Sequence, residues 1–324
     1  MKAAPFEYAR ATSLAEACAL LAEHGADAKL IAGGQSLVPM MAMRLARPAW
    51  LVDIDRLEEL RRIELREGVL ALGATVRQCA LEREALALKH LPLIGKALKW
   101  VGHVQTRNRG TLGGSIVHAD PSAELPLVAC VLDATLVLQE AGSTTEMPAR
   151  EFFFAPMVTA IAPEQCLAEI RFPVWPQART GCAFEEISIR HGDFALVSAC
   201  AQVALDEAGV CLRAEIGIGG ASPFPHALPE AGAMLLGAAP DEAMIEEVAA
   251  AAAGMIDADG DLHASADYRR HLARVLAARV LKAAIEDARA RGGPEDALRT
   301  RGRAEDARAP GGEPGGTASG GTLR

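Results

Sequence analysis

The sequence contains no apolar run long enough to cross a bilayer, which takes roughly 18–20 consecutive apolar residues, although half of its 324 residues are hydrophobic. Its start, Met1 to Glu7, has no apolar core of the kind that a secretory signal peptide needs, so we expect no export and a cytoplasmic location. Positive charge is in deficit as well. A formal net charge of −9 disfavours nucleic acid as a partner, because phosphates require a basic surface.

Clustered cysteines are also missing, since the seven cysteines include no C-x-x-C pair. Several stand in apolar runs, where a thiol behaves as a small hydrophobic side chain, so we predict buried free thiols in a reducing compartment. An iron–sulfur cluster needs neighbouring cysteine ligands. Any such cluster is therefore expected on a partner chain. The cysteines are Cys18, Cys79, Cys130, Cys166, Cys182, Cys200 and Cys211.

Three common site patterns are absent. No G-x-G-x-x-G occurs, which argues against a Rossmann dinucleotide site; Gly217-Ile-Gly219-Gly220 comes nearest but has Ser222 at the last position. The run Asp257 to Asp261 has its glycine in the fourth place, whereas a calcium loop has it in the sixth, so we predict a helix–helix loop without metal. No Ser/His/Asp pattern indicates hydrolysis, and we predict no catalytic acid or base.

Two glycine-rich stretches are what the sequence does offer. The first glycine loop is Ala32-Gly33-Gly34-Gln35-Ser36, and the second glycine loop is Thr111-Leu112-Gly113-Gly114-Ser115. Glycine adopts positive φ and lets backbone N–H groups approach a ligand closely, and consecutive inward N–H groups make an anion-binding concavity. Either loop alone is weak evidence, because Gly-Gly pairs occur in ordinary turns. As a pair they suit a ligand with two linked phosphates.

Together the two loops resemble the pyrophosphate-binding segments of the FAD-binding medium subunit of the molybdenum hydroxylases, the carbon monoxide dehydrogenase and xanthine dehydrogenase flavoprotein family. The resemblance runs from Met1 to about Ala290. It implies an α+β fold: an FAD-binding domain of the PCMH/vanillyl-alcohol-oxidase type over residues 1–175, with subdomains at about 1–56 and 57–175. A C-terminal flavoprotein domain over residues 176–290 would follow.

Local patterns predict the elements of these domains. Ser13 and Glu16 form a capping box at the start of a helix, and the proline-containing stretch 173–180 is the best domain boundary. The turn 206–209 joins two of three antiparallel strands, and helices follow them, which is typical of an α+β domain. Residues 291–324 are poor in bulky apolar side chains and predict a disordered tail. We expect helices at 14–24, 39–44, 75–85, 93–101, 125–131, 241–254 and 265–290, a long loop from 103 to 124, and strands at 29–32, 50–54, 69–74, 135–138, 166–172, 182–190, 195–205 and 210–218.

The resemblance also implies individual roles. Glu124 matches an aspartate of xanthine dehydrogenase relatives that binds the ribityl side of the flavin; Asp120 is close enough to compete, or it begins an Asp-Pro turn. Leu167 matches a position that packs on the cofactor. Phe194, in the segment from Arg190 to Ala195, would bring a ring near the isoalloxazine, where relatives often carry tyrosine.

For several other side chains the sequence allows two roles. Ser36 contacts phosphate or caps a helix, and His118 is a polar neighbour of the cofactor or a structural residue. Arg107 and Arg109 neutralise phosphate or face solvent. Relatives can have lysine where Glu185 stands, so its contact with FAD is open.

The resemblance implies a function in electron transfer. FAD on this chain would take electrons from the [2Fe-2S] clusters of an iron–sulfur small subunit, fed by a large subunit with the molybdenum cofactor, in a dimer of heterotrimers, and pass them to an external acceptor. A stand-alone FAD-dependent oxidase and a non-catalytic scaffold are the alternatives. The sequence leaves open the substrate and the acceptor, whether NAD, oxygen, a quinone or a cytochrome.

Overall fold

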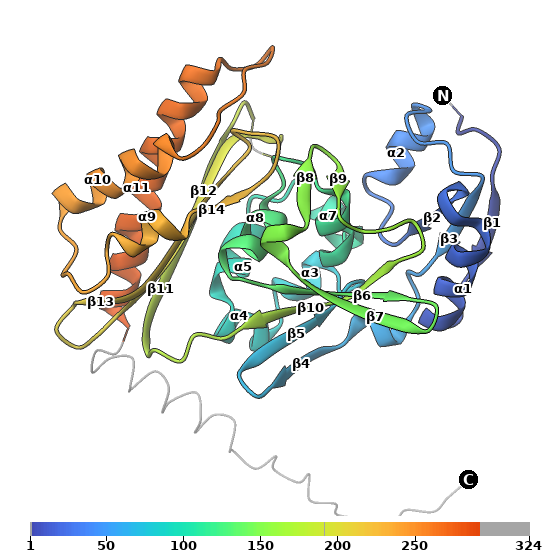
Figure 1. The fold of residues 1–324 in the computed structure, drawn as a ribbon, viewed down its shortest axis with the longest axis horizontal. Coiled ribbons are helices and arrows are strands. Elements are labelled where there is room, and N and C mark those ends of the chain that lie inside the picture. Colours follow the sequence, from blue (N-terminus) through green and yellow to red (C-terminus); the bar gives the residue numbers. More distant parts are fainter. Residues whose placement is uncertain (1, 191, 292–324) are drawn as a thin grey trace, which may run out of the picture.

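The computed structural model describes residues 2–190 and 192–291. It arranges them as three larger sheets side by side, with a two-stranded hairpin and helices around them (Figure 1). The N-terminal lobe is a parallel sheet in the order β1-β3-β2. Its core includes Ala17, Leu21 and Val52. The lobe consists of β1 (Glu7–Arg10), α1 (Leu14–His24), β2 (Ala28–Ile31), α2 (Leu37–Ala42) and β3 (Trp50–Asp53), with a 3₁₀ turn at Gly25–Asp27.

Helix α1 has the predicted bounds because its end signals are local. Ser13 accepts a hydrogen bond from the Glu16 N–H at 3.1 Å, and Gly25 ends the helix with φ +52°. The other half of the capping box is shifted by one residue, since the Glu16 carboxylate accepts from the Thr12 N–H at 2.7 Å rather than from Ser13. Helix α2 begins two residues before the predicted Pro39.

The central sheet is antiparallel, in the order β4-β5-β10-β6-β7, and it packs on a group of short helices. Leu70, Leu72, Ile170 and Phe172 lie fully buried beneath these helices. The strands are β4 (Ile63–Arg66), β5 (Val69–Gly73), β6 (Thr135–Glu140), β7 (Ser143–Pro148) and β10 (Cys166–Pro173), with a small hairpin of β8 (Phe153–Ala155) and β9 (Val158–Thr159). The helices are α3 (Gln78–Leu81), α4 (Ala85–His90), α5 (Pro92–Leu98), α6 (Val104–Arg109), α7 (Leu112–His118) and α8 (Glu124–Val131), and 3₁₀ turns lie at Glu58–Arg61 and Ala149–Glu151.

Two predictions for this region are wrong. Thr75 does not cap a helix through residue 85, because its hydroxyl donates to the Leu60 carbonyl at 3.0 Å, and two short helices, α3 and α4, replace the predicted one. The expected long loop from 103 to 124 contains α6 and α7. Thr111 caps α7 by accepting from the Gly114 N–H at 3.1 Å. Leu112 and Ile116, one turn apart, anchor α7 in the core.

The C-terminal sheet has the three long antiparallel strands that the sequence predicts and a fourth, short strand that it does not, in the order β11-β12-β13-β14. Side chains alternate along β11: Ala183 faces α10 and α11, whereas Cys182 and Phe184 face the central helices. The elements are β11 (Arg179–Ser188), β12 (Ala195–Leu205), β13 (Cys211–Gly219), β14 (His226–Ala227), α9 (Pro229–Ala233), α10 (Glu242–Gly254) and α11 (Ala266–Ala290).

Several remaining predictions concern the whole chain. All seven cysteines are free, and all but Cys79 are buried, as expected. Within residues 2–190 and 192–291, no helix is both long and apolar enough to span a membrane. The same residues contain no group of three or more His, Cys, Asp or Glu side chains that could hold a metal ion. The predicted tail lies outside the described residues except for Arg291. We propose the domain boundary at 173–180, between the end of β10 at Pro173 and the start of β11 at Arg179.

Candidate flavin site

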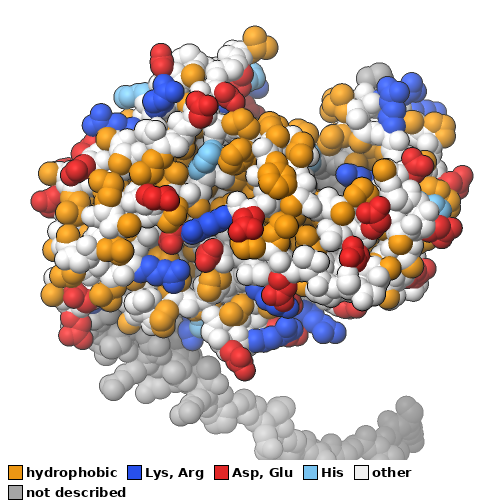
Figure 2. Space-filling model, in the orientation of Figure 1, with side chains coloured by type: hydrophobic (Ala, Val, Ile, Leu, Met, Phe, Trp, Pro, Cys, Tyr) orange, Lys and Arg blue, Asp and Glu red, His pale blue; other side chains and the backbone are white. Residues whose placement is uncertain are grey.

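A cavity of about 1380 Å³ opens between the N-terminal lobe and the rest of the molecule. Figure 2 shows the surface hollowed at this place, with hydrophobic side chains along its edges. Both glycine loops line the cavity, together with the segment 120–124, Leu167, Phe194 and the loop that precedes α11. Pockets for drug-sized ligands usually have about 300–1,000 Å³, so this cavity accommodates a long, dinucleotide-sized ligand.

The first glycine loop connects β2 to α2 and carries free donors. The backbone N–H groups of Gly33, Gly34, Gln35 and Ser36 donate to no acceptor among the described residues. Gly34 has φ +71°, a conformation that favours glycine. The Ser36 hydroxyl makes no capping bond to α2, so its predicted alternative as a helix cap is wrong. Four successive unpaired N–H groups beside a cavity are the geometry that binds an anion; we call them the N–H cradle.

The second glycine loop is built differently, because its N–H groups are used inside the protein. Leu112 donates to the Val76 carbonyl at 3.0 Å, Gly113 to the Ala74 carbonyl at 2.8 Å, and Gly114 to the Thr111 hydroxyl. The loop therefore lines the cavity with Thr111, the surfaces of Gly113 and Gly114, and Ser115. The prediction that Leu112 lines the cofactor site is wrong. Its side chain is fully buried in the core and does not line the cavity, because it lies on the side of α7 that packs in the central core.

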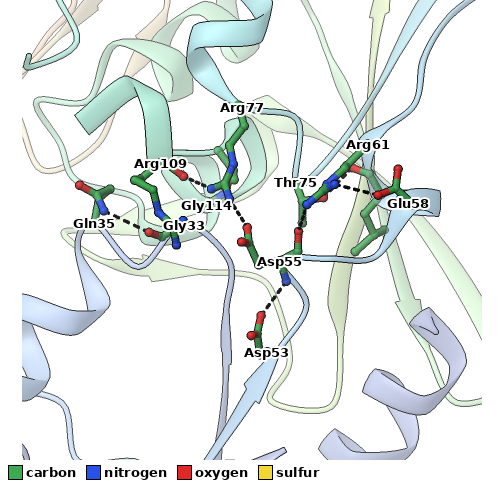
Figure 3. Close-up of polar contacts among 12 residues, drawn as sticks. Gly33, Gln35, Asp53, Asp55, Glu58, Arg61, Thr75, Arg77, Arg109 and Gly114 are labelled. Atoms are coloured by element: carbon green, nitrogen blue, oxygen red, sulfur yellow. Dashed lines mark hydrogen bonds and ion pairs between the residues drawn. The ribbon is translucent and has the colours of Figure 1, made fainter. Parts of the chain in front are cut away.

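The two loops meet at one backbone contact. A Cβ on Gly33 would lie 2.1 Å from the Arg109 carbonyl oxygen, so only glycine permits this approach. The same carbonyl accepts a hydrogen bond from the Arg77 guanidinium, whose other nitrogen lies 2.5 Å from an Asp55 carboxylate oxygen (Figure 3). This Arg77 bridge ties the end of β3 to the end of α6, and so holds the N-terminal lobe against the second glycine loop.

Two carboxyl groups follow the second loop. Asp120 accepts from the Ser122 N–H at 2.9 Å, which confirms its interpretation as the start of a turn. A hydrogen bond links the turn to the C-terminal sheet, since the Ser122 hydroxyl donates to the Ala195 carbonyl at 2.8 Å. Glu124 is partly buried at the start of α8 and lines the cavity. Burial raises its pKa to about 7, Asp120 adds to the effect, and Arg107 opposes it.

Of the other predicted residues, some line the cavity and some point away from it. Leu167 is 3% exposed and Phe194 is 71% exposed, so the first forms the wall and the second stands at the mouth. His118 lines the cavity, and burial lowers its pKa. Arg107 turns away, binding Glu82 at 2.9 Å and the carbonyls of Val101 and Gly102.

Two positions that the sequence left open are now placed. The Glu185 carboxylate faces α11 and pairs with Arg279 at 3.8 Å, so it does not reach the cavity. Arg109 is exposed beside the first glycine loop (Figure 3), on the rim of a smaller hollow. In the segment from Arg190 to Ala195, His191 lies outside the described residues.

Sequence reasoning missed three parts of the site. Gln78 is buried, and its side-chain oxygen is unpaired among the described residues at the cavity wall. The loop from residue 257 to 261 does join α10 to α11, as predicted, but it also borders the cavity through Asp259 and Asp261. Arg77 bridges two distant segments. None of these has a local pattern that would single it out in the sequence.

Comparison with known protein families accounts for nearly all of the chain. Residues 4–175 match the FAD binding domain in molybdopterin dehydrogenase, and residues 182–284 match the CO dehydrogenase flavoprotein C-terminal domain. The chain belongs to the FAD-binding medium subunits of the carbon monoxide dehydrogenase and xanthine dehydrogenase family. It is therefore the flavoprotein subunit of an oxidoreductase, and its cofactor is FAD.

Individual relatives of this medium subunit cover the same span. It is 39% identical over 289 residues to the 6-hydroxypseudooxynicotine dehydrogenase complex subunit alpha of Paenarthrobacter nicotinovorans, covering 89% of this chain and 97% of the relative. It is 34% identical to the carbon monoxide dehydrogenase medium chain of Hydrogenophaga pseudoflava, over 86% of this chain and 96% of that one. Among solved structures, quinoline 2-oxidoreductase from Pseudomonas putida 86 superimposes with a TM-score of 0.84 at 34% identity, covering 89% of this chain and all of its counterpart.

The residues present in this medium subunit fit FAD. The N–H cradle offers unpaired donors for a pyrophosphate, and the glycine surface of the second loop leaves room beside it. The same cavity is also lined by Leu167, Glu124 and Phe194, so it offers an apolar wall, a carboxyl group and an aromatic ring. The α+β architecture expected from the resemblance is confirmed.

Proposed function

We propose that this medium subunit is an electron relay, which receives electrons from the [2Fe-2S] clusters of a partner and passes them through FAD to an external acceptor. The observation that carries the proposal is the N–H cradle in a cavity that is large enough for a dinucleotide, in a chain that matches flavoprotein subunits over both of its parts. When bound, FAD supplies the redox chemistry, and the protein supplies position and electrostatics.

The chain's own residues then have positioning roles. The N–H groups from Gly33 to Ser36 would hold the pyrophosphate, with the hydroxyls of Ser36 and Ser115 beside it. Glu124 would bind the ribityl side, and Leu167 would pack against the cofactor. Phe194, which is largely exposed, would cover the isoalloxazine at the mouth of the cavity. No residue in this set has to act as an acid or base on the organic substrate.

We further propose two partner chains, an iron–sulfur small subunit and a molybdenum-binding large subunit, in a dimer of heterotrimers. The names of the relatives support a multi-subunit complex, since they are called medium chains or subunits of dehydrogenase complexes. The buried free thiols support a reducing compartment such as the cytoplasm. The relatives' names cover caffeine, carbon monoxide and glyceraldehyde, so this subunit does not predict the substrate.

Purification of the tagged chain from its native host tests the relay. We expect flavin absorption bands overlaid by the broad absorption of iron–sulfur clusters, together with two co-purifying chains. A chain that purifies alone, contains FAD and is reduced directly by a small molecule would instead favour the stand-alone oxidase. A chain that releases no flavin on denaturation would favour the scaffold.

A further inference from the structure

One acidic side chain behind the cavity wall has no role in the site described above. Glu186 lies on β11 and is 5% exposed. It points to the same side of the sheet as Phe184, toward the central helices. Neither of its carboxyl oxygens has a hydrogen-bond partner within residues 2–190 and 192–291. An ionised carboxylate in this position would be costly, because nothing replaces the water that it loses.

The strand register places Glu186 in a row of small and polar residues that α8 partly covers. Glu186 is paired with Ser198 on β12, and Ser198 with Gly219 on β13. The Ser198 hydroxyl is also buried and unpaired among the described residues. A Cβ on Gly219 would lie 2.8 Å from that hydroxyl and 3.3 Å from Leu127 of α8. Helix α8 therefore lies over the part of this row formed by Ser198 and Gly219, whereas α5 packs on β11.

Glu124 stands at the end of α8 that reaches the cavity. It precedes Leu127 by three residues, so both side chains lie on the same face of the helix. Val131, on that face too, lies over Gly217, which gives the direction of the helix along β13. Glu124 thus lines the cavity at the end of the helix that covers Ser198 and Gly219, and Glu186 is the strand partner of Ser198.

The electrostatics agree with this geometry. Burial is the main cause that raises the pKa of Glu186 to about 8, and the charge of Glu124 adds to it. The pKa of Glu124 is itself raised to about 7. Because the two carboxyl groups interact, their titration belongs to the pair rather than to either residue.

Charged groups on the elements around β11 and β12 have partners of their own. Arg269 of α11 donates to the carbonyls of Leu196 and Gly220 and to the Asp261 carboxylate. Asp120 and Arg107 act on Glu124 rather than on Glu186. Lys96 of α5 meets β11 at the Cys182 carbonyl and is paired with Asp287 at 3.0 Å. On the opposite face of the strand, Glu185 is paired with Arg279 of α11, and β12 presents the uncharged Ser198 to Glu186.

We propose that Glu186 holds a proton at neutral pH and forms with Glu124 an acid pair behind the flavin cavity, which takes up a proton when FAD binds. The proposal uses FAD binding alone and is independent of the electron relay. FAD brings two phosphate charges into the cavity, and negative charge nearby favours the protonated form of a carboxyl group. The affinity for FAD should accordingly fall as the pH rises through the titration of the pair, between about pH 7 and 8.

Titration calorimetry of the FAD-free full-length chain with FAD tests the proposal, in two buffers with different enthalpies of ionisation. The difference between the buffers gives the protons taken up. For the wild type we expect uptake approaching about one proton per FAD and a loss of up to about tenfold in affinity per pH unit above pH 7. At pH 8, where Glu186 is itself partly ionised, we expect both effects to shrink strongly in Glu186→Gln, because the amide does not ionise.

Glu185→Gln is the matched control, since it changes the neighbouring glutamate on the opposite face of the same strand. It should keep the proton uptake and the pH dependence of the wild type. Infrared spectroscopy gives a second measurement that needs no ligand. The absorption of buried protonated carboxyl groups at neutral pH should lose the contribution of Glu186 in Glu186→Gln and stay unchanged in Glu185→Gln. Unchanged proton uptake at pH 8 in a folded Glu186→Gln variant, or no such absorption in the wild type, would overturn the proposal. Absence of FAD binding by the wild type would instead contradict the flavin site itself.

Discussion

The Gly33→Ala variant is expected to bind FAD about 10- to 100-fold more weakly than the wild type. One added methyl group suffices, because the new Cβ would lie 2.1 Å from the Arg109 carbonyl oxygen and 2.9 Å from the carbonyl carbon. Both neighbours are backbone atoms, so no side chain can rotate away. Relieving such a clash typically costs about 1–3 kcal/mol. Here it would separate the two glycine loops and displace the N–H cradle.

Fluorescence titration of the FAD-free variant with FAD measures this effect. Gly254→Ala is the control, because a Cβ at Gly254 meets nothing within 4 Å and the substitution is the same. It should bind FAD as the wild type does. Circular dichroism should show both variants folded. Wild-type affinity in Gly33→Ala would mean that the contact between the loops does not shape the flavin site.

Removal of the Arg77 bridge should have the next largest effect, a loss of about tenfold in FAD affinity in Arg77→Ala. Arg77 and Asp55 are both mostly buried, with side-chain exposures of 19% and 17%, so water does not replace their interaction well. A hydrogen bond to a charged group contributes about 1.5–3 kcal/mol. Its loss would free the N-terminal lobe to move away from the second glycine loop.

Arg77→Lys should recover only part of the affinity, since one ammonium group cannot reproduce the planar fork of arginine that reaches both Asp55 and the Arg109 carbonyl. Arg274→Ala provides the control. Its pair with Glu246 is exposed, and exposed pairs contribute little. The same fluorescence titration applies. Normal FAD affinity together with a lower melting temperature in Arg77→Ala would show that the bridge stabilises the fold without shaping the site.

Elements with complete local signals were predictable from the sequence. Helix α11 has its capping serine at Ser265, α10 has its capping aspartate at Asp241, and β12 is a long, mostly apolar and mostly buried run. Helices α6 and α7 were missed for a physical reason. They have six and seven residues, too few for intrinsic helix stability. Tertiary packing of Leu112 and Ile116 holds α7 in place, and no local pattern reports such packing.

The candidate site was predictable in position but not in construction. The two glycine loops look equivalent in sequence, and the structure brings both to one cavity. Only the first leaves its N–H groups free, because Val76 and Ala74 supply carbonyl partners to the second. Leu112 was assigned to the cofactor because it stands within the motif, although helical geometry turns it inward. Arg77 and Glu186 act through residues far away in the chain, which a single sequence does not reveal.

Removal of FAD from the purified complex tests the central claim most directly. The complex is reduced anaerobically with a limiting amount of dithionite, then mixed with NAD, oxygen, a quinone or a cytochrome in turn while the iron–sulfur absorption is followed. The relay predicts rapid reoxidation by at least one acceptor when FAD is present, none on the same timescale when it has been removed, and recovery after FAD is added back. Equal reoxidation of the clusters with and without FAD would contradict the claim that electrons leave the complex through this chain.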